Sequence, residues 1–315
     1  MKIQNPFNPI IHAYYKLSNW GKVLIFVVIL LALVIFFKSI NEKKNQKEGF
    51  EQNHDFSFLS GSKVYDDFYV NIYDQLVYNE IKDEYEVGEI INRTTPTSES
   101  IILDIGSGTG HHVALLNKKG HKASGVDISN SMIKKAKENY PDLKFEQGDV
   151  NDALLFKPSS YTHILCMYFT IYYIKDKDLF LRNCFDWLMP GGYLVVHLVD
   201  RDEFDPILPV ANPLLVISPQ RYAKKRITNS KVSFNNFTYD ANFHLDTSKN
   251  IGIFKEKFNF SNNNKPRKQE HIFYMETEDE ILTKAQQIGF LILGKIDLMK
   301  CAYDYQYLYI LNKPS

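Results

Sequence analysis

The sequence predicts an α/β fold built around a mostly parallel β-sheet. Between residues 101 and 199, short apolar runs of strand length alternate with amphipathic segments of helical length. Such alternation is typical of βαβ units, in which each helix connects two parallel strands. A glycine-rich turn at residues 106–110 directly follows the first apolar run, and two further apolar runs near the end of the chain predict a terminal antiparallel hairpin.

The parallel region contains five expected strands and three expected helices. The first strand reads Ile-Ile-Leu-Asp-Ile, and its continuous apolar character is typical of a strand that is buried on both faces. Ser129 suits the N-cap of the second helix. In chain order, the expected strands cover residues 101–105, 122–126, 143–146, 161–169 and 193–199, and the expected helices cover residues 111–119, 129–139 and 176–188.

Different patterns flank this region. Residues 62–92 place apolar side chains at helical spacing and predict a helical segment. Residues 201–226 contain four prolines and predict a loop. Residues 231–260 alternate aromatic and polar side chains, which favours antiparallel strands, and residues 271–275 form a further expected strand.

The C-terminal part is expected to contain one helix and a hairpin. Thr277 and Glu280 have the spacing of a capping box, which predicts a helix that runs to Ile288 before a glycine. Residues 290–298 and 305–311 are apolar and are expected to form the two strands of the hairpin.

The N-terminal part carries an apolar run from Val23 to Phe37, flanked by Lys22 and Lys38. As a helix the run covers roughly 22 Å, which is short of a hydrocarbon core of about 30 Å unless the lysines reach toward the interfaces. A buried core helix and a cleaved signal peptide are the alternatives, but the run has no polar stripe and no small-residue cleavage site follows it. We therefore expect a transmembrane helix over residues 23–38.

The flanking charges predict which side of the membrane the folded part occupies. Lysines after the apolar run slightly outnumber those before it, so the C-terminal side is expected in the cytosol. The predicted protein is thus a single-pass membrane protein with a cytosolic domain. Cys166, Cys184 and Cys301 agree with a reducing compartment, since they offer neither a disulfide framework nor zinc-ligand spacing.

The overall charge excludes one class of partner. The chain has 37 Lys and Arg against 37 Asp and Glu, so its formal net charge is zero. Proteins that coat DNA need a strong cationic surface. We therefore expect no DNA partner.

The glycine-rich turn and three acids carry the chemical signal. The turn lacks the Gly-Lys-Ser/Thr of a phosphate-binding loop, and its third glycine comes one residue too early for a dinucleotide fingerprint. Asp104 immediately precedes the turn, where it would repel a pyrophosphate and suit a cation. Asp127 and Asp149 follow the ends of the next two strands, where Asp127 can accept ribose hydroxyls. This arrangement indicates a site for a positively charged adenosyl nucleoside.

Four segments resemble successive motifs of one enzyme family. ILDIGSGTGHH, GVDIS, EQGDV and LMPGGYLVV occur in this order and are similar to those of the class I S-adenosylmethionine-dependent methyltransferases. The resemblance is close over residues 62–200 and looser over residues 277–311. It implies a Rossmann-like, seven-stranded sheet with an antiparallel terminal hairpin, and S-adenosylmethionine as the cofactor.

The resemblance also implies how the glycine turn would be used. Gly106, Gly108 and Gly110 would pack against the methionine part of the cofactor. Asp104 would help to hold the amino group of the cofactor through water.

The later strand ends would bind the nucleoside part. By the same resemblance, Asp127 would bind the ribose hydroxyls, and Ile128 would lie against the adenine. Asp149 would meet the adenine amino group, and Val150 would lie beside the ring.

The segment after the fourth strand would complete the cofactor site. The resemblance implies that Cys166 and Met167 offer backbone carbonyls near the cofactor. Tyr168 and Tyr173 would line the site.

No catalytic motif of the ribose or base methyltransferases is recognisable after the fourth strand. Tyr173, His197 and His271 are candidates for a base or an acceptor contact, although a structural role is the alternative for both histidines. Three tyrosines with a spacing of four residues either cover the cofactor or pack on the domain: Tyr65, Tyr69 and Tyr73.

The acceptor is not apparent from the sequence. We expect a membrane-anchored methyltransferase with a small or amphiphilic acceptor. One alternative is a protein or RNA methyltransferase, supported only by basic patches at residues 224–226 and 265–268. The other is a non-catalytic module that binds the cofactor.

The domain organisation follows from these elements. We expect an N-terminal tail, the transmembrane helix, a polar linker, and a methyltransferase domain with an insertion that covers the acceptor. In order, these parts are residues 1–22, 23–38, 39–61 and 62–315, and the insertion is residues 201–274.

Overall fold

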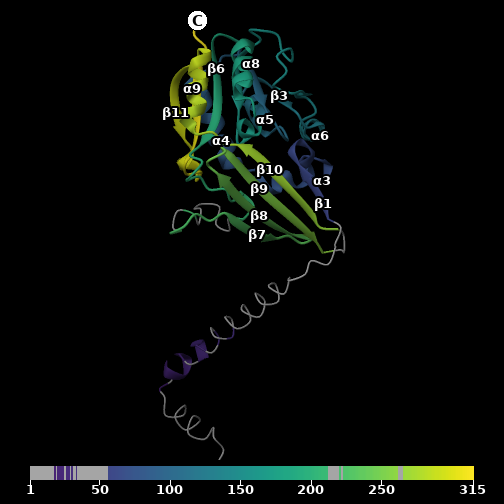
Figure 1. The fold of residues 1–315 in the computed structure, drawn as a ribbon, viewed down its shortest axis with the longest axis vertical. Helices are drawn as coiled ribbons and strands as arrows, with labels where there is room; N and C mark the ends of the chain where they lie inside the picture. The colour runs from purple at the N-terminus through teal and green to yellow at the C-terminus, as the bar shows by residue number, and fades with distance from the viewer. Residues whose placement is uncertain are drawn as a thin grey trace, which may run out of the picture. The chain divides into compact units, whose positions relative to one another are not determined.

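The computed structural model describes most of the chain after residue 55. The described residues are 18, 20–24, 26–28, 30, 33, 56–211, 220, 223–261 and 265–315. The chain divides into two compact units, Met1–His54 and Asp55–Ser315. Both β-sheets belong to the second unit (Figure 1).

The prediction of a transmembrane helix over residues 23–38 is wrong. Residues 20–24, 26–28, 30 and 33 are helical, while the rest of the predicted span lies outside the described residues. None of the described helices has the length and apolar character that crossing a membrane requires. As a helix, the apolar run is shorter than the hydrocarbon core of a typical bilayer, and this difference in length argues against a transmembrane span. The compartment of the domain stays a prediction.

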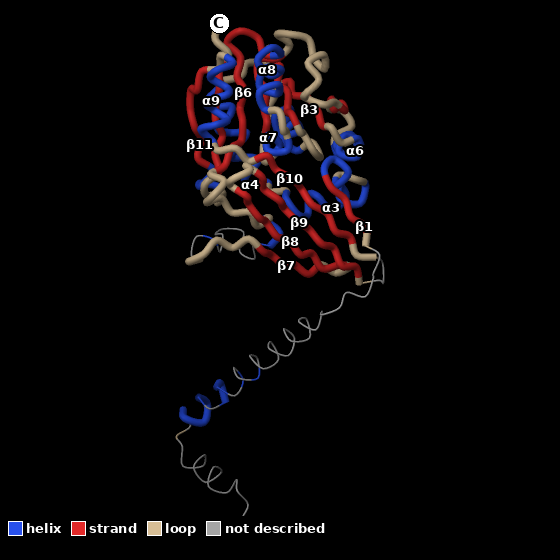
Figure 2. The backbone as a smooth tube through the Cα atoms, in the orientation of Figure 1, coloured by secondary structure: helices blue, strands red, loops and turns tan. Residues whose placement is uncertain are grey.

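The larger sheet has seven strands, as the resemblance implied. Its order is β11-β12-β6-β5-β2-β3-β4; β12 pairs antiparallel with both β11 and β6, and all other neighbouring strands are parallel. Figure 2 shows the strands in red. Their bounds are β2 (Ile101–Ile105), β3 (Lys122–Asp127), β4 (Lys144–Gln147), β5 (Tyr161–Cys166), β6 (Leu188–Val199), β11 (Leu291–Asp297) and β12 (Gln306–Asn312).

Helices cover both faces of this sheet. The bounds are α4 (Glu80–Thr94), α5 (His111–Lys118), α6 (Asn130–Asn139), α8 (Lys177–Trp187) and α9 (Glu278–Ile288). Along β2, Ile102 packs with Val87 of α4 and Val113 of α5, whereas Leu103 belongs to a second core together with Trp187 of α8. The alternation arises because successive side chains of a strand point to opposite faces.

A second sheet has five strands, four of which follow β6 in the chain. Its order is β1-β10-β9-β8-β7, with β1 parallel to β10 and the other pairs antiparallel. The bounds are β1 (Ser57–Ser60), β7 (Asn229–Ser233), β8 (Phe237–Asp246), β9 (Ile251–Phe260) and β10 (Arg267–Tyr274). Phe243, Phe254 and Phe258 face the same core as Trp187, so this sheet packs on one end of the larger sheet (Figure 1). Residues 39–55 of the predicted linker lie outside the described residues, whereas residues 57–60 form β1.

The predicted helical segment at residues 62–92 is interrupted. It consists of η1 (Gly61–Val64), α3 (Asp67–Val77) and α4. Asp66 and Asn79 each accept a hydrogen bond from a backbone N–H three residues ahead, which caps α3 and α4 separately. Each N-cap starts a new helix, so the segment with a continuous apolar pattern forms two separate helices. The remaining short helices are α7 (Thr170–Tyr173), η2 (Pro209–Ala211) and η4 (Leu298–Cys301).

Candidate active site

The glycine turn lies at the carboxyl end of β2 and has a backbone that favours glycine. Gly106, Gly108 and Gly110 have φ values of 68°, 52° and 93°. A Cβ at Gly106 would lie 2.5 Å from side-chain atoms of Thr170. Gly106 and Gly108 line a cavity at this end of the sheet, whereas Gly110 is the N-cap of α5 and would place a Cβ 2.7 Å from Phe145. Gly110 therefore serves helix packing and does not line the cavity.

Asp127 is held in place by two backbone donors. The N–H of Gly108 donates to its Oδ2 at 3.0 Å, and the N–H of Ser129 donates to its Oδ1 at 2.8 Å. Burial raises the pKa of Asp127, and these two hydrogen bonds oppose the rise. Each carboxylate oxygen retains a lone pair for a ligand hydroxyl in the cavity that Asp127 lines.

Asp104 is more deeply buried. Its side chain does not line the cavity, its exposed fraction is 2%, and its Oδ1 has no hydrogen-bond partner among the described residues. Burial raises the pKa of Asp104 to about 7. A buried carboxyl oxygen without a partner indicates that a donor is missing from this part of the site.

The cavity has a volume of about 440 Å³. Six of the predicted cofactor residues line it: Gly106, Gly108, Asp127, Ile128, Asp149 and Val150. The other four do not line it: Asp104, Gly110, Cys166 and Met167. Cys166 and Met167 are buried in the sheet core, so only their backbone is available for the predicted role.

Tyrosines form a large part of the cavity wall. Tyr65, Tyr69 and Tyr73 line it, although Tyr69 also packs into the core with an exposed fraction of 2%. Tyr168 and Tyr173 line it from the segment after β5. Tyr168 has a φ of 49°, which is unusual for an aromatic residue and is often found at functional sites.

Tyr173 and His271 are brought together at the cavity. The Tyr173 hydroxyl lies 2.7 Å from His271 Nδ1, and the Tyr65 hydroxyl donates to the Tyr173 hydroxyl at 2.7 Å. His271 Nε2 lies 2.7 Å from Oε2 of Glu256 in β9. Two of the three predicted catalytic candidates thus share one hydrogen-bonded chain.

His197 takes a different position. Its side chain is fully buried and does not line the cavity. Its Nδ1 lies 2.5 Å from the backbone oxygen of Tyr168, and its Nε2 lies 3.1 Å from Gln306 Oε1. Burial lowers the pKa of His197 to about 4. A neutral ring that holds the strained backbone of Tyr168 is a structural histidine.

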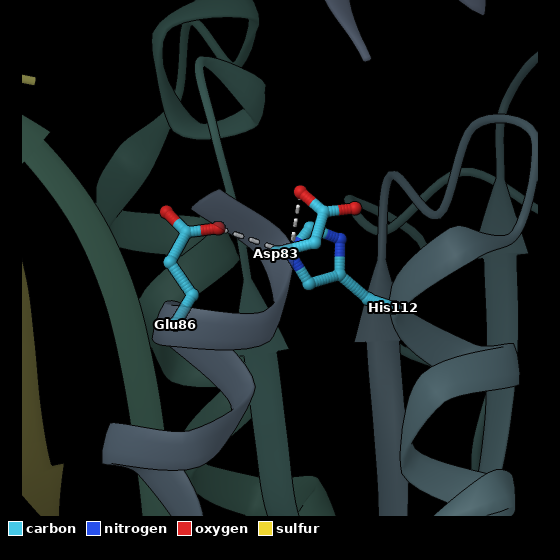
Figure 3. Close-up of side chains that lie close together, drawn as sticks. All are labelled: Asp83, Glu86 and His112. Carbon is cyan, nitrogen blue, oxygen red and sulfur yellow. Dashed lines mark hydrogen bonds and ion pairs between the residues drawn. The ribbon is translucent and has the colours of Figure 1, made fainter. Parts of the chain in front are cut away.

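A charged cluster lies between α4 and α5. Asp83 and Glu86 project from α4 toward the ring of His112 (Figure 3), with Nε2 3.8 Å from Asp83 Oδ1 and 3.1 Å from Glu86 Oε2. Two carboxylates and an imidazole this close together could hold a metal ion. However, Lys82 Nζ lies 2.6 Å from Glu86 Oε1. Burial opposes the charge on His112, but the two carboxylates raise its pKa to about 9. Two cations thus balance two carboxylates, which indicates an ion-pair cluster.

Sequence reasoning missed Glu256, which lies at the centre of the polar chain behind the cavity. Its carboxylate also accepts hydrogen bonds from Tyr69, Tyr239 and Gln269. The signal was present in the alternation of β9, where Glu256 falls on the same face as two buried phenylalanines. A carboxylate that is buried on an apolar face needs hydrogen-bond donors or a cation beside it.

Comparison with known proteins supports the resemblance. Residues 102–192 match the model of a methyltransferase domain. A dTDP-4-amino-2,3,4,6-tetradeoxy-D-glucose N,N-dimethyltransferase of Saccharopolyspora spinosa is 30% identical over 147 residues, which are 45% of this chain and 58% of that protein. A ubiquinone/menaquinone biosynthesis C-methyltransferase of Vibrio vulnificus is 32% identical over 35% of this chain and 45% of that protein. The chain spans about half the length of these curated relatives.

Solved structures share the fold over a longer stretch. The CcbJ methyltransferase of Streptomyces caelestis has a TM-score of 0.61 at 15% identity, covering 81% of this chain and 99% of that chain. DesVI of Streptomyces venezuelae has a TM-score of 0.54 at 18% identity, covering 84% and 100%. At these identities the likeness concerns the fold. Residues 102–192 thus match a methyltransferase domain, and the fold and the motif series agree with those of the class I S-adenosylmethionine-dependent methyltransferases.

The residues of the cavity fit the cofactor of this class. S-Adenosylmethionine combines a ribose diol, an adenine, a sulfonium and an ammonium group. The cavity offers a fixed carboxylate at Asp127, an open backbone at Gly108, and acids that suit positive charge. The unpartnered oxygen of Asp104 lies just before the glycine turn.

Proposed function

We propose that this protein transfers a methyl group from S-adenosylmethionine to a small-molecule acceptor. The observation that carries the proposal is one cavity that is lined on one side by the larger sheet and on the other side by the second sheet. The carboxyl ends of β2, β3 and β4 supply Gly108, Asp127 and Asp149, and the second sheet supplies Phe254 and His271. A cofactor and an acceptor held in this cavity would meet at its middle.

The roles of the cofactor-binding residues follow from their positions. Asp127 accepts the ribose hydroxyls, because its carboxylate is already oriented by Gly108 and Ser129. Ile128 and Val150 contact the adenine ring. Asp104 attracts the ammonium group, and it does so only as a carboxylate. When bound, the cofactor supplies an activated methyl group.

The acceptor is proposed to be neutral or cationic. No lysine or arginine lines the described part of the cavity, whereas Asp127, Asp149 and Asp205 do. An acceptor with several negative charges would therefore lack counter-charges there. Two curated relatives are N,N-dimethyltransferases of amino sugars, which supports an amine.

The wall residues give the chain two tasks besides binding. Aromatic side chains such as Phe169, Phe204 and Phe273 exclude water from the space around the acceptor. The tyrosines and His271 orient the acceptor for in-line attack, which lowers the barrier chiefly through positioning. A protein or RNA acceptor is less well supported, because Arg226 and Arg267 of the two basic patches are engaged in hydrogen bonds within the protein.

Calorimetry of the full-length chain tests the proposal. We expect S-adenosylmethionine and its demethylated product to bind, and transfer of labelled methyl to occur with members of a panel of small amines. The variant Asp127→Asn should weaken binding, whereas Asp142→Asn, which changes an exposed carboxylate, should not. A folded protein that binds neither compound at millimolar concentration would refute the proposal.

A further inference from the structure

A continuous chain of hydrogen-bonding groups runs from the cavity to a buried carboxylate. It begins at the hydroxyls of Tyr65 and Tyr173, which line the cavity and lie 2.7 Å apart. It continues from the Tyr173 hydroxyl to His271 Nδ1 at 2.7 Å, and from His271 Nε2 to Glu256 Oε2 at 2.7 Å. Every distance allows a hydrogen bond, so a proton can move along the chain.

Glu256 is built to remain negatively charged. Its side chain is fully buried, and its carboxylate accepts hydrogen bonds from Tyr69 at 3.1 Å, Tyr239 at 2.6 Å and Gln269 at 2.5 Å, besides facing His271. Burial alone would raise the pKa of Glu256, but His271 and the other donors lower it. A carboxylate in this setting stabilises a positive charge on the imidazole beside it.

The two tyrosines are suited to pass a proton on. Burial raises the pKa of Tyr65 and of Tyr173 well above that of free tyrosine. Neither phenol therefore holds a negative charge at neutral pH. A neutral hydroxyl that both accepts and donates can receive one proton while it releases another to the neighbouring imidazole.

We propose that the Tyr65–Tyr173–His271–Glu256 chain accepts a proton from the acceptor during methyl transfer, and that the acceptor is therefore a primary or secondary amine. This inference rests on the proposed function. The amine nitrogen uses its lone pair to form a bond to the methyl carbon. The carbon–sulfur bond breaks, and its electron pair stays on the sulfur, which becomes a neutral thioether.

The proton balance closes at His271. The amine proton passes to the hydroxyl of Tyr173, directly or through Tyr65, and the hydroxyl proton passes to His271 Nδ1. The resulting imidazolium is paired with Glu256. Glu256 acts as a positioning residue, because it orients and stabilises the imidazole and does not line the cavity.

The surroundings of His271 leave Glu256 as the carboxylate that contacts it. Tyrosine rings pack against His271 from α3, from α7 and from the residue two positions before α3, and Arg267 on the same face of β10 is tied to Asp66 and Gln269. The ionisable groups in contact with the ring are Glu256, Tyr65, Tyr69 and Tyr173, whereas Tyr239 of β8 contacts Glu256. Glu256 is thus the one carboxylate among the described residues that is shown in contact with the ring.

The pH dependence of methyl transfer tests the inference. The full-length chain would be assayed with labelled S-adenosylmethionine and a panel of primary and secondary amines between pH 6.5 and 10. We expect His271→Gln to lower kcat on the order of 10²- to 10⁴-fold near pH 7. The loss should shrink toward pH 10, because an alkylamine then loses its proton to solvent, near a pKa of about 10. A purely structural role would give a loss that does not depend on pH.

Two more conservative substitutions distinguish loss of the relay from loss of the fold. Tyr173→Phe removes one hydroxyl and should reproduce the pH-dependent loss, and Glu256→Gln should reduce kcat more than it changes KM. His244→Gln on the exposed face of β8 and Tyr307→Phe on β12 are matched controls that should retain wild-type rates. Cofactor affinity should stay close to that of the wild-type protein in all variants, because Tyr173→Phe keeps the ring that lines the cavity and the other substitutions lie outside the proposed cofactor contacts.

The possible results separate the relay, the amine assignment and the proposed function. Wild-type rates at pH 7 in His271→Gln and Tyr173→Phe would overturn the relay, as would equal losses at pH 7 and pH 10. Cofactor binding without transfer to any amine of the panel would overturn the amine assignment and leave the cofactor site standing. Failure of the folded wild-type protein to bind S-adenosylmethionine would overturn the proposed function together with the relay.

Discussion

The backbone N–H of Gly108 donates a hydrogen bond to Oδ2 of Asp127, at a distance of 3.0 Å and a sequence separation of 19 residues. This contact joins the glycine turn after β2 to the end of β3. It fixes the carboxylate before any ligand arrives, and a preorganised carboxylate loses little freedom when it binds.

Replacing Asp127 is expected to weaken cofactor binding. In Asp127→Ala, each charged hydrogen bond to a ribose hydroxyl is lost, at a cost of about 1.5–3 kcal/mol. Asp127→Asn keeps one oxygen acceptor and should retain part of the affinity. Titration calorimetry with S-adenosylmethionine measures both, and an unchanged dissociation constant in Asp127→Ala would remove Asp127 from the ribose site.

Asp104 is expected to make cofactor affinity depend on pH. Burial raises its pKa from 3.8 to about 7, so it is largely neutral at pH 6 and largely ionised at pH 8. Only the carboxylate attracts the ammonium group, so affinity should rise by up to about tenfold between these values. Calorimetry at both pH values measures the rise, and Asp104→Asn should abolish it.

The raised pKa of Asp104 also affects the stability of the fold, which it lowers as the pH rises. The folded state holds the Asp104 proton more tightly than the unfolded state does. The contribution of Asp104 to the free energy of unfolding therefore falls as the pH rises from about 4 to about 7. If cofactor affinity does not change between pH 6 and pH 8, the charge of Asp104 does not act on the ammonium group of the cofactor.

The Asp83–Glu86–His112 cluster is expected to stabilise the fold most below neutral pH. The pKa of His112 rises from 6.5 to about 9, so its stabilising effect is complete below pH 6.5 and is lost as the pH rises through 9. A rise of this size corresponds to about 3 kcal/mol. Denaturant titrations at pH 6.5 and 9.5 would measure it. The difference should be smaller in His112→Gln, and equal differences in both proteins would contradict the assignment.

Two glycines should respond oppositely to substitution by alanine. Gly106→Ala should destabilise the protein by at least about 1–2 kcal/mol, because φ is positive and the new Cβ would meet Thr170 at 2.5 Å. Gly88→Ala in α4 has nothing within 4 Å of its Cβ and should stabilise the protein by about 0.5–1 kcal/mol. Thermal unfolding compares the two variants, and a neutral Gly106→Ala would show that the turn tolerates a side chain.

The cofactor side of the cavity could be predicted because its determinants are local in sequence. Asp104 and Gly106 lie within one strand and one turn, and the carboxyl ends of neighbouring parallel strands meet at the same edge of the sheet. Gly110 was an exception. Its role in packing against Phe145 depends on β4, which the motif does not reveal.

The acceptor side could be predicted only in part. Tyr173 and His271 are 98 residues apart, and the chain from His271 to Glu256 depends on how β9 and β10 are paired. His271 lies opposite Phe254, so Glu256 is its diagonal neighbour. No single-sequence pattern specifies such a register, because strand alternation gives the face but not the partner. The prediction of a transmembrane helix is wrong for another reason, because apolar character alone does not specify a span and the run is shorter than a bilayer core.

The parallel pairing of β1 with β10 has a consequence for synthesis. Ser57 pairs with Arg267, so the first strand of the second sheet waits roughly 210 residues for its neighbour to be made. At 5–20 residues per second, this wait lasts about 10–40 s on the ribosome. During that time the strands of the cofactor half are already available, whereas β10 and its His271 are not. A nascent chain that ends before residue 267 therefore contains β2 to β6 but lacks His271 of the acceptor wall, together with β11 and β12 of the larger sheet.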